Sequence, residues 1–173
     1  MPNLGLKSIL IFSLLMLGNS LDAQILWRNT HSGMSPKELK QSVKGLIFPG
    51  NPQTWGNGTI EMFDLEKVII SNYIFTARFL FKQQKLEQVT LELNEKPSWG
   101  ETMNIYDELF QTLKYKYGNP VFHELSGPPY YRKELTWLSG KTNVTLYAST
   151  VDINETLLEI IYQTRISKNA QGL

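Results

Sequence analysis

The sequence predicts an α+β fold: two tandem repeats, each a helix followed by antiparallel strands, that pack two helices against one sheet. Two segments carry helix-start or helix-stop signals around apolar residues at helical spacing. Strand-like segments with alternating apolar and polar residues follow each of them, a pattern typical of antiparallel sheets with one buried face. The two repeats span about residues 33–94 and 100–164.

The first repeat opens with a strong helix start at Ser35. Its hydroxyl can cap the free amides, Pro36 suits the first helical position, and Glu38 completes a capping box. We expect this helix to end near Gly45 to Pro49. One face of this helix should be apolar and consists of Leu39, Val43 and Leu46 or Ile47.

Four strand-like segments follow this helix. Residues Thr59–Phe63 and Lys67–Ser71 predict two short strands. Residues Asn72–Lys82 predict the clearest strand, which a turn at 82–85 reverses into Leu86–Leu93. In the clearest strand one face should be apolar and consists of Tyr73, Phe75, Ala77, Phe79 and Phe81.

The second repeat begins with a helix from about Glu101 to Tyr117. Gly118 should end it, and Pro120 prevents its continuation. A loop, Leu125–Tyr131, is expected next. Three strands should follow, at Lys133–Leu138, Asn143–Ser149 and Thr156–Thr164.

The first 23 residues have the layout of a cleavable signal peptide. Lys7 precedes a short apolar run, Ile9–Leu17, and Ala23 is a small residue suited to the position before a cut. The run is about half the roughly 20 residues that a membrane-spanning helix requires. We therefore expect residues 1–23 to be removed, a single domain at 24–166, a disordered tail at 167–173, and a periplasmic or secreted protein.

Composition narrows the classes of function. The chain has no cysteine, which excludes thiolate zinc sites and thiol catalysis and favours a bacterial exported protein. Its 17 basic and 16 acidic residues give a net charge of +1 without a basic block, so no nucleic-acid partner is expected. No other apolar run of comparable length occurs, so no membrane span is expected in the mature chain.

Two segments resemble a known family. These are Gly33–Leu39 (GMSPKEL) and Leu113–Pro120 (LKYKYGNP), followed by Trp137 on the next strand. Together with the tandem layout, they are similar to the beta-lactamase inhibitory protein fold, shared by outer-membrane assembly lipoproteins of the SmpA/OmlA type. The resemblance implies the fold above and a protein-binding role. The chain lacks the disulfides of the inhibitor and the lipidated cysteine of the lipoproteins.

No catalytic, metal or cofactor signature stands out. The histidines, His31 and His123, have no metal-ligand spacing, and no elbow motif marks a nucleophile. The pair Asp107-Glu108 reads as a solvated helix face. The sequence therefore favours a non-enzymatic protein without metal or cofactor, with an uncharacterised hydrolase as a remaining alternative.

Loop aromatics are the candidate partner-binding residues. Trp55 and Trp99 lie in Gly/Pro-rich segments, and two prolines hold Tyr130, Tyr131 and Arg132 together. Tyr, Trp and Arg are the residue types enriched at interface hot spots. We expect an exported, non-enzymatic module that binds another protein, such as an inhibitor or immunity protein against an extracytoplasmic enzyme. The alternative is a cell-envelope assembly or structural factor.

Overall fold

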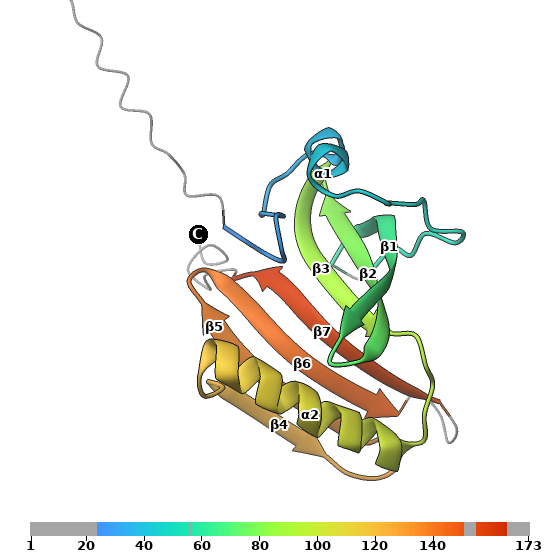
Figure 1. Ribbon diagram of the computed structural model, residues 1–173, viewed down its shortest axis with the longest axis vertical. Coiled ribbons are helices and arrows are strands. Elements are labelled where there is room, and N and C mark those ends of the chain that lie inside the picture. The colour runs from blue at the N-terminus through green and yellow to red at the C-terminus, as the bar shows by residue number, and fades with distance from the viewer. Residues whose placement is uncertain (1–23, 56, 151–154, 166–173) are drawn as a thin grey trace, which may run out of the picture.

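The computed structural model describes residues 24–55, 57–150 and 155–165. Over these residues the chain forms one seven-stranded antiparallel sheet and two helices (Figure 1). The predicted signal peptide, 1–23, and the predicted tail, 167–173, lie outside the described residues. In chain order the elements are α1 (Pro36–Ser42), β1 (Ile60–Ile70), β2 (Tyr73–Lys82), β3 (Lys85–Leu93), α2 (Trp99–Tyr117), β4 (Phe122–Ser126), β5 (Arg132–Ser139), β6 (Thr142–Thr150) and β7 (Thr156–Thr164).

The strand order is β1-β2-β3-β7-β6-β5-β4, so β3 and β7 join two meanders into one sheet. Across this junction Val89 pairs with Tyr162, and Leu91 pairs with Ile160. All four side chains are buried in the same hydrophobic core. The first and second halves of the chain are therefore parts of one continuous core.

Helix α2 begins and ends where its local chemistry dictates. The Ser98 hydroxyl accepts a hydrogen bond from the backbone N–H of Glu101, and the Glu101 carboxylate accepts one from the backbone N–H of Ser98. The two bonds form a capping box. Gly118 ends the helix at a φ of 81°, a conformation that favours glycine. The helix packs against β5, β6 and β7 and buries Tyr106 and Leu109 fully.

The prediction of two tandem repeats that pack two helices against the sheet is wrong. α1 has only seven residues and buries only Leu39, whereas α2 has 19 residues. The capping box at Ser35 and Glu38 forms as expected, but Val43 is already extended, with φ −120° and ψ 122°. A capping box fixes where a helix begins and does not determine its length.

An irregular segment, residues 26–34, covers part of the sheet in place of the longer first helix that was expected. Trp27 lies 6.3 Å from Phe79 between ring centroids, and the Gly33 amide donates to the Leu86 carbonyl at 2.8 Å. Leu26, Trp27 and Met34 are buried in the same core as β2 and β3. The apolar side of this half of the sheet is thus partly covered by residues 26–34, which lack helical periodicity.

Two strand predictions also need correction. The two short strands expected at 59–63 and 67–71 are one strand, β1, interrupted by register shifts; Lys67 adopts a φ of 57° at the second. β4 occupies part of the region expected to be a loop. Four of its five residues are exposed, so it lacks the alternation that marks a half-buried strand.

The prediction for β2 and β3 is confirmed. Phe75, Ala77 and Phe79 are fully buried and pair with Leu93, Leu91 and Val89. The connecting turn has positive φ at Gln83 (48°) and Gln84 (62°), as a two-residue type I′ hairpin requires. The sheet therefore has an apolar face toward α2 and a polar face on its other side.

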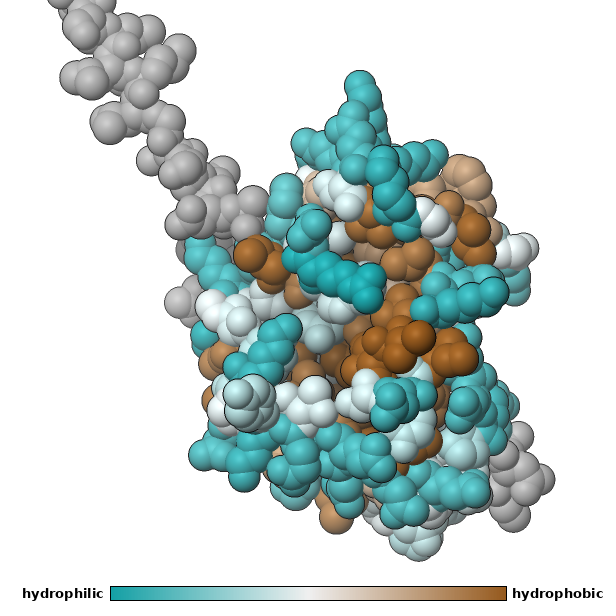
Figure 2. All heavy atoms as spheres, viewed as in Figure 1, coloured by the Kyte–Doolittle hydropathy of each residue, from teal (hydrophilic) through white to brown (hydrophobic). Residues whose placement is uncertain are grey.

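The β1–β2 hairpin reaches α2. The Ser71 and Thr112 hydroxyls lie 3.2 Å apart, and the Tyr73 hydroxyl donates to Glu108 at 3.1 Å. Figure 2 shows apolar side chains at the surface between this hairpin and α2. Within the described ranges, no helix is long and apolar enough to cross a membrane.

Candidate functional site

Trp99 and Tyr131 form a stacked aromatic pair at one end of the sheet. Their ring centroids are 5.4 Å apart and their planes differ by 28°. Trp99 is the first residue of α2, directly after the Ser98 cap, and it packs partly against the core. The Tyr131 amide donates to the Thr150 hydroxyl, and its carbonyl accepts the Thr150 amide, both at 3.0 Å. Helix cap and strand end therefore hold both rings in fixed positions.

Tyr130 extends this pair toward solvent. Its side chain is 66% exposed, against 39% for Tyr131. Its carbonyl accepts a long hydrogen bond, 3.5 Å, from the hydroxyl of Ser126 at the end of β4. We call Trp99, Tyr130 and Tyr131 the aromatic end surface. Large rings fixed at a surface are the kind of group that anchors protein interfaces, since little side-chain entropy remains to be lost on binding.

Arg132 does not join this surface. Arg132 pairs with Ser149 on β6. Lys133, the next residue along β5, reaches Asp107 of α2 at 3.0 Å. Because side chains alternate along a strand, Arg132 points to the opposite, polar face of the sheet. Its guanidinium lies 2.6 Å from Glu134 and 3.8 Å from Glu124. The hydrogen bond to Glu134 raises the pKa of Arg132. Arg132 is therefore already neutralised by two carboxylates.

Trp55 lies at a different site, on the polar face of the sheet. It is 39% exposed and borders a cavity of about 350 Å³ together with Arg78, Glu92 and Glu159. Its backbone is held by a tight turn in which its amide donates to the Thr59 carbonyl at 2.9 Å. The five predicted residues therefore fall into three places: the aromatic end surface, the Arg132 ion pairs and this polar cavity.

A cluster of charged groups extends from the polar cavity, at Arg78, Glu92 and Glu159, to Glu61 and Asp64 on β1. The Arg78 guanidinium forms ion pairs with Glu92, at 2.9 Å, and with Glu61, at 3.7 Å, and Glu61 is only 4% exposed. Burial, followed by repulsion from Glu92, raises the pKa of Glu159 to about 7. Burial and the adjacent Glu61 carboxyl likewise raise the pKa of Asp64 to about 7. More carboxyl groups than cations meet here, so some of them hold protons near neutral pH.

This cluster was not predicted from the sequence, although one signal for it was present. Glu159 interrupts the apolar run Leu157–Ile161, and a carboxyl group inside such a run requires a partner or a proton. Among the described residues, no group of three or more metal-ligating side chains is arranged to hold a metal ion. His31 is half-buried beside the N-terminal segment, and His123 is exposed on β4.

β4 supplies an open sheet edge next to the aromatic end surface. It is the last strand in the order of the described sheet. Phe122 and Leu125 on β4 are 47% and 65% exposed, and Val121, just before the strand, is 62% exposed. The opposite edge, β1, is partly covered, because Ile47 and Asp64 exchange backbone hydrogen bonds at 2.9 and 3.0 Å. An uncovered strand edge offers unpaired amides and carbonyls to another chain.

Fold and sites together define a cysteine-free α+β domain with one antiparallel sheet, one covering helix and a pre-formed aromatic surface. Residues 26–168 match the TP0088 domain, and the chain belongs to this family. Comparisons with curated proteins and with solved structures find no match.

Proposed function

We propose that this protein is an exported, non-enzymatic module that binds another protein at the aromatic end surface and the adjoining β4 edge. Its most concrete form is an inhibitor or immunity protein that acts on an extracytoplasmic enzyme. The export component rests on residues 1–23, whose charge and apolar run have the layout of a signal peptide.

The observation that carries the proposal is the Trp99–Tyr131 stack beside the exposed Tyr130. An exposed ring that rotates freely loses conformational entropy when a partner orders it. A stacked ring has already lost much of this entropy on folding. The neighbouring β4 edge adds backbone groups that a partner strand can pair with, which is a recurrent mode of peptide recognition. Affinity would then come from both the rings and the main chain.

Two sets of side chains make the proposed contact with the partner. Tyr130 and Tyr131 supply the aromatic contact, and Leu125 supplies an apolar contact on β4 where a partner strand would lie. Arg132 is left out of the contact because Glu124 and Glu134 already bind it. Trp55 is left out because it borders a separate cavity on the polar face.

The test starts with capture of partners from the native cell envelope and continues with the captured partner in purified form. The variants are the double change Tyr130→Ala/Tyr131→Ala and the single change Leu125→Lys. Tyr115→Ala is the matched control, because Tyr115 is 96% exposed on α2 and belongs to neither surface. Circular dichroism confirms that each variant is folded.

We expect the first two variants to weaken binding of the purified partner at least tenfold and the control to change it less than twofold. Inhibition of a captured enzyme would support the inhibitor role, and capture of outer-membrane assembly components would favour the envelope-assembly alternative. Equal binding by all variants would refute the assigned surface. Failure to capture any stoichiometric partner would argue against a protein-binding function.

A further inference from the structure

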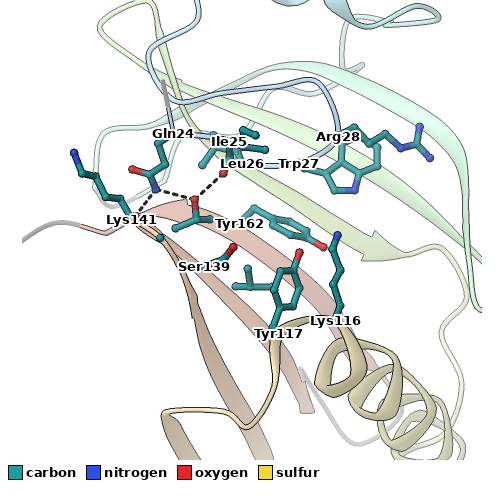
Figure 3. A pocket seen from close by; sticks show the side chains of 13 residues that line it. Gln24, Ile25, Leu26, Trp27, Arg28, Lys116, Tyr117, Ser139, Lys141 and Tyr162 are labelled. Atoms are coloured by element: carbon teal, nitrogen blue, oxygen red, sulfur yellow. Dashed lines mark hydrogen bonds between the residues drawn. The ribbon is translucent and has the colours of Figure 1, made fainter. Parts of the chain in front are cut away.

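A second, larger cavity lies where the N-terminal segment meets the end of α2. Its volume is about 550 Å³, within the range of about 300–1,000 Å³ typical of small-molecule sites. Figure 3 shows its walls, which come from residues 24–28, the last turn of α2, the β5–β6 turn and the neighbouring parts of β6 and β7. It shares no lining residue with the aromatic end surface or with the polar cavity.

The cavity exists because the N-terminal segment is tied to the sheet at its beginning. The side-chain amide of Gln24 donates to the Lys141 carbonyl and, at 2.8 Å, to the Thr142 hydroxyl. The Thr142 hydroxyl in turn donates to the Ile25 carbonyl at 2.7 Å. These hydrogen bonds hold the start of the segment across the strands, Leu26 and Trp27 pack into the core behind it, and space remains between the segment and α2.

Most of the wall is apolar. Leu26 and Trp27 are 4% and 8% exposed, and Val144 on β6 is 1% exposed. Trp27 is fixed from behind by Phe79 of β2, at 6.3 Å between ring centroids. An apolar ligand body would therefore meet a pre-formed surface and would release water from it on binding.

Three polar groups converge at one side of this apolar wall. Tyr162 is 5% exposed, and burial, together with hydrogen bonding to Tyr117, raises its pKa well above the ordinary value. The Tyr162 phenol is therefore held in its protonated form, and it forms a hydrogen-bonded pair with the Tyr117 hydroxyl. The Lys116 ammonium lies 5.0 Å from the centroid of the Tyr117 ring, and Figure 3 shows it directed toward the two hydroxyls.

The charge around the cavity is of one sign. Arg28, Lys116 and Lys141 line it, and no described lining residue is acidic. Within the described ranges, every ion pair to a lysine or arginine involves Arg78, Lys96, Arg132 or Lys133. Arg28 and Lys116 instead lie over aromatic rings, at 4.2 Å from Trp27 and 5.0 Å from Tyr117. These cations can therefore attract an anion without first breaking an ion pair.

We propose that this cavity binds an organic carboxylate with an apolar body, the carboxylate at Lys116, Tyr117 and Tyr162 and the body against Leu26, Trp27 and Val144. A carboxylate has two oxygens that accept hydrogen bonds, which matches the Lys116 ammonium and the one hydroxyl proton that the Tyr117–Tyr162 pair does not use internally. A neutral apolar molecule would make no ion pair with the cations that line the cavity, Arg28, Lys116 and Lys141. An apolar cation would be repelled by them. This site is independent of the protein-binding surface proposed above.

The test is isothermal titration of the purified protein with decanoate below its micelle concentration. Decanol, decyltrimethylammonium and acetate are the comparison probes: the first lacks the charge, the second reverses it, and the third lacks the apolar body. We expect saturable binding of decanoate, at least tenfold weaker binding of decanol, and no measurable binding of the other two. Absence of saturable decanoate binding, or equal binding of decanol or of the cation, would overturn the proposal.

Variants locate the site. Lys116→Gln should weaken decanoate binding about tenfold, and Tyr162→Phe should weaken it several-fold with little change in decanol binding. Lys114→Gln is the matched control: Lys114 is exposed on the same helix but lies over Phe110, at 5.6 Å, outside the cavity lining. Lys116 is itself exposed, so its variant should fold. If Lys114→Gln weakens binding as much as Lys116→Gln, the effect is general electrostatics and the assigned site is wrong.

Discussion

The Trp137 indole donates its N–H to the carbonyl oxygen of Gly118 at 2.9 Å. Gly118 ends α2, and Trp137 is fully buried on β5, with its ring 6.3 Å from Phe110 of the same helix. One side chain thus fixes both the exit of the helix and its packing on the sheet. The Gly118–Pro120 exit and Trp137, which carry parts of the same family resemblance in the sequence, are joined in space.

Trp137→Phe should therefore be strongly destabilising. The change removes the indole N–H, leaves the Gly118 carbonyl without that donor, and opens a cavity in the core. We expect a loss of roughly 2–4 kcal/mol in the free energy of unfolding, measured by urea denaturation followed by circular dichroism. Trp55→Phe, at a partly exposed position, should cost less than about 0.5 kcal/mol. Similar costs for the two variants would contradict the role assigned to Trp137.

Glu159 should make the protein less stable as the pH rises. Its carboxyl has a pKa of about 7 in the folded protein against an ordinary value of 4.5, so folding favours the protonated form. The unfolded chain releases this proton first, and stability is lost as the pH rises from about 4.5 to about 7. The total loss is on the order of 3 kcal/mol. Asp64 contributes in the same direction.

Glu159→Gln removes the titrating group while keeping its size. We expect this variant to be more stable than the wild type at pH 8 and nearly equal to it at pH 4, as measured by chemical denaturation at both values. Glu124→Gln serves as control, because Glu124 is 44% exposed and lies 3.8 Å from Arg132. An equal effect of Glu159→Gln at both pH values would show that the Glu159 carboxyl is not protonated on folding.

The β2–β3 turn offers a stabilising change. Gln83 and Gln84 both have positive φ, which costs energy for residues with a Cβ and is best met by Asn-Gly. Gln83→Asn with Gln84→Gly should raise the free energy of unfolding by roughly 1 kcal/mol. Gln163→Gly, inside β7, should lower it by a similar amount. The assigned turn geometry is wrong if the double variant is destabilised.

Processing at Ala23 is a separate prediction from the sequence. If residues 1–23 are a signal peptide, the intact mass of the extracytoplasmic protein should correspond to a chain that begins at Gln24. Ala23→Phe should block the cut, because a bulky side chain does not fit the position before it. Asp22→Asn should leave processing unchanged. A wild-type protein that retains Met1–Ala23 in that fraction would sink the prediction of cleavage.

The sequence by itself determined the local features of this protein. The caps at Ser35 and Ser98, the Gly118 helix end and the β2–β3 hairpin follow from interactions between residues close together in the chain. All of these except the Ser98 cap were predicted, and the Ser-x-x-Glu spacing of that cap is also present in the sequence. The apolar face of β2 was also predictable, since alternation directly reflects a strand with one buried side.

Only the tertiary structure decided the architecture and the sites. The expected tandem repeats failed because the length of α1 and the covering role of residues 26–34 depend on packing, which local signals do not encode. The β3–β7 pairing brings Glu92 opposite Glu159, and these residues lie 67 positions apart in the chain. Likewise, Lys116 and Trp27 line one cavity from distant segments. Cavities, charge clusters and stacked rings arise from contacts between residues far apart in the chain. Some of their residues could therefore be predicted from the sequence, but not which of them lie together.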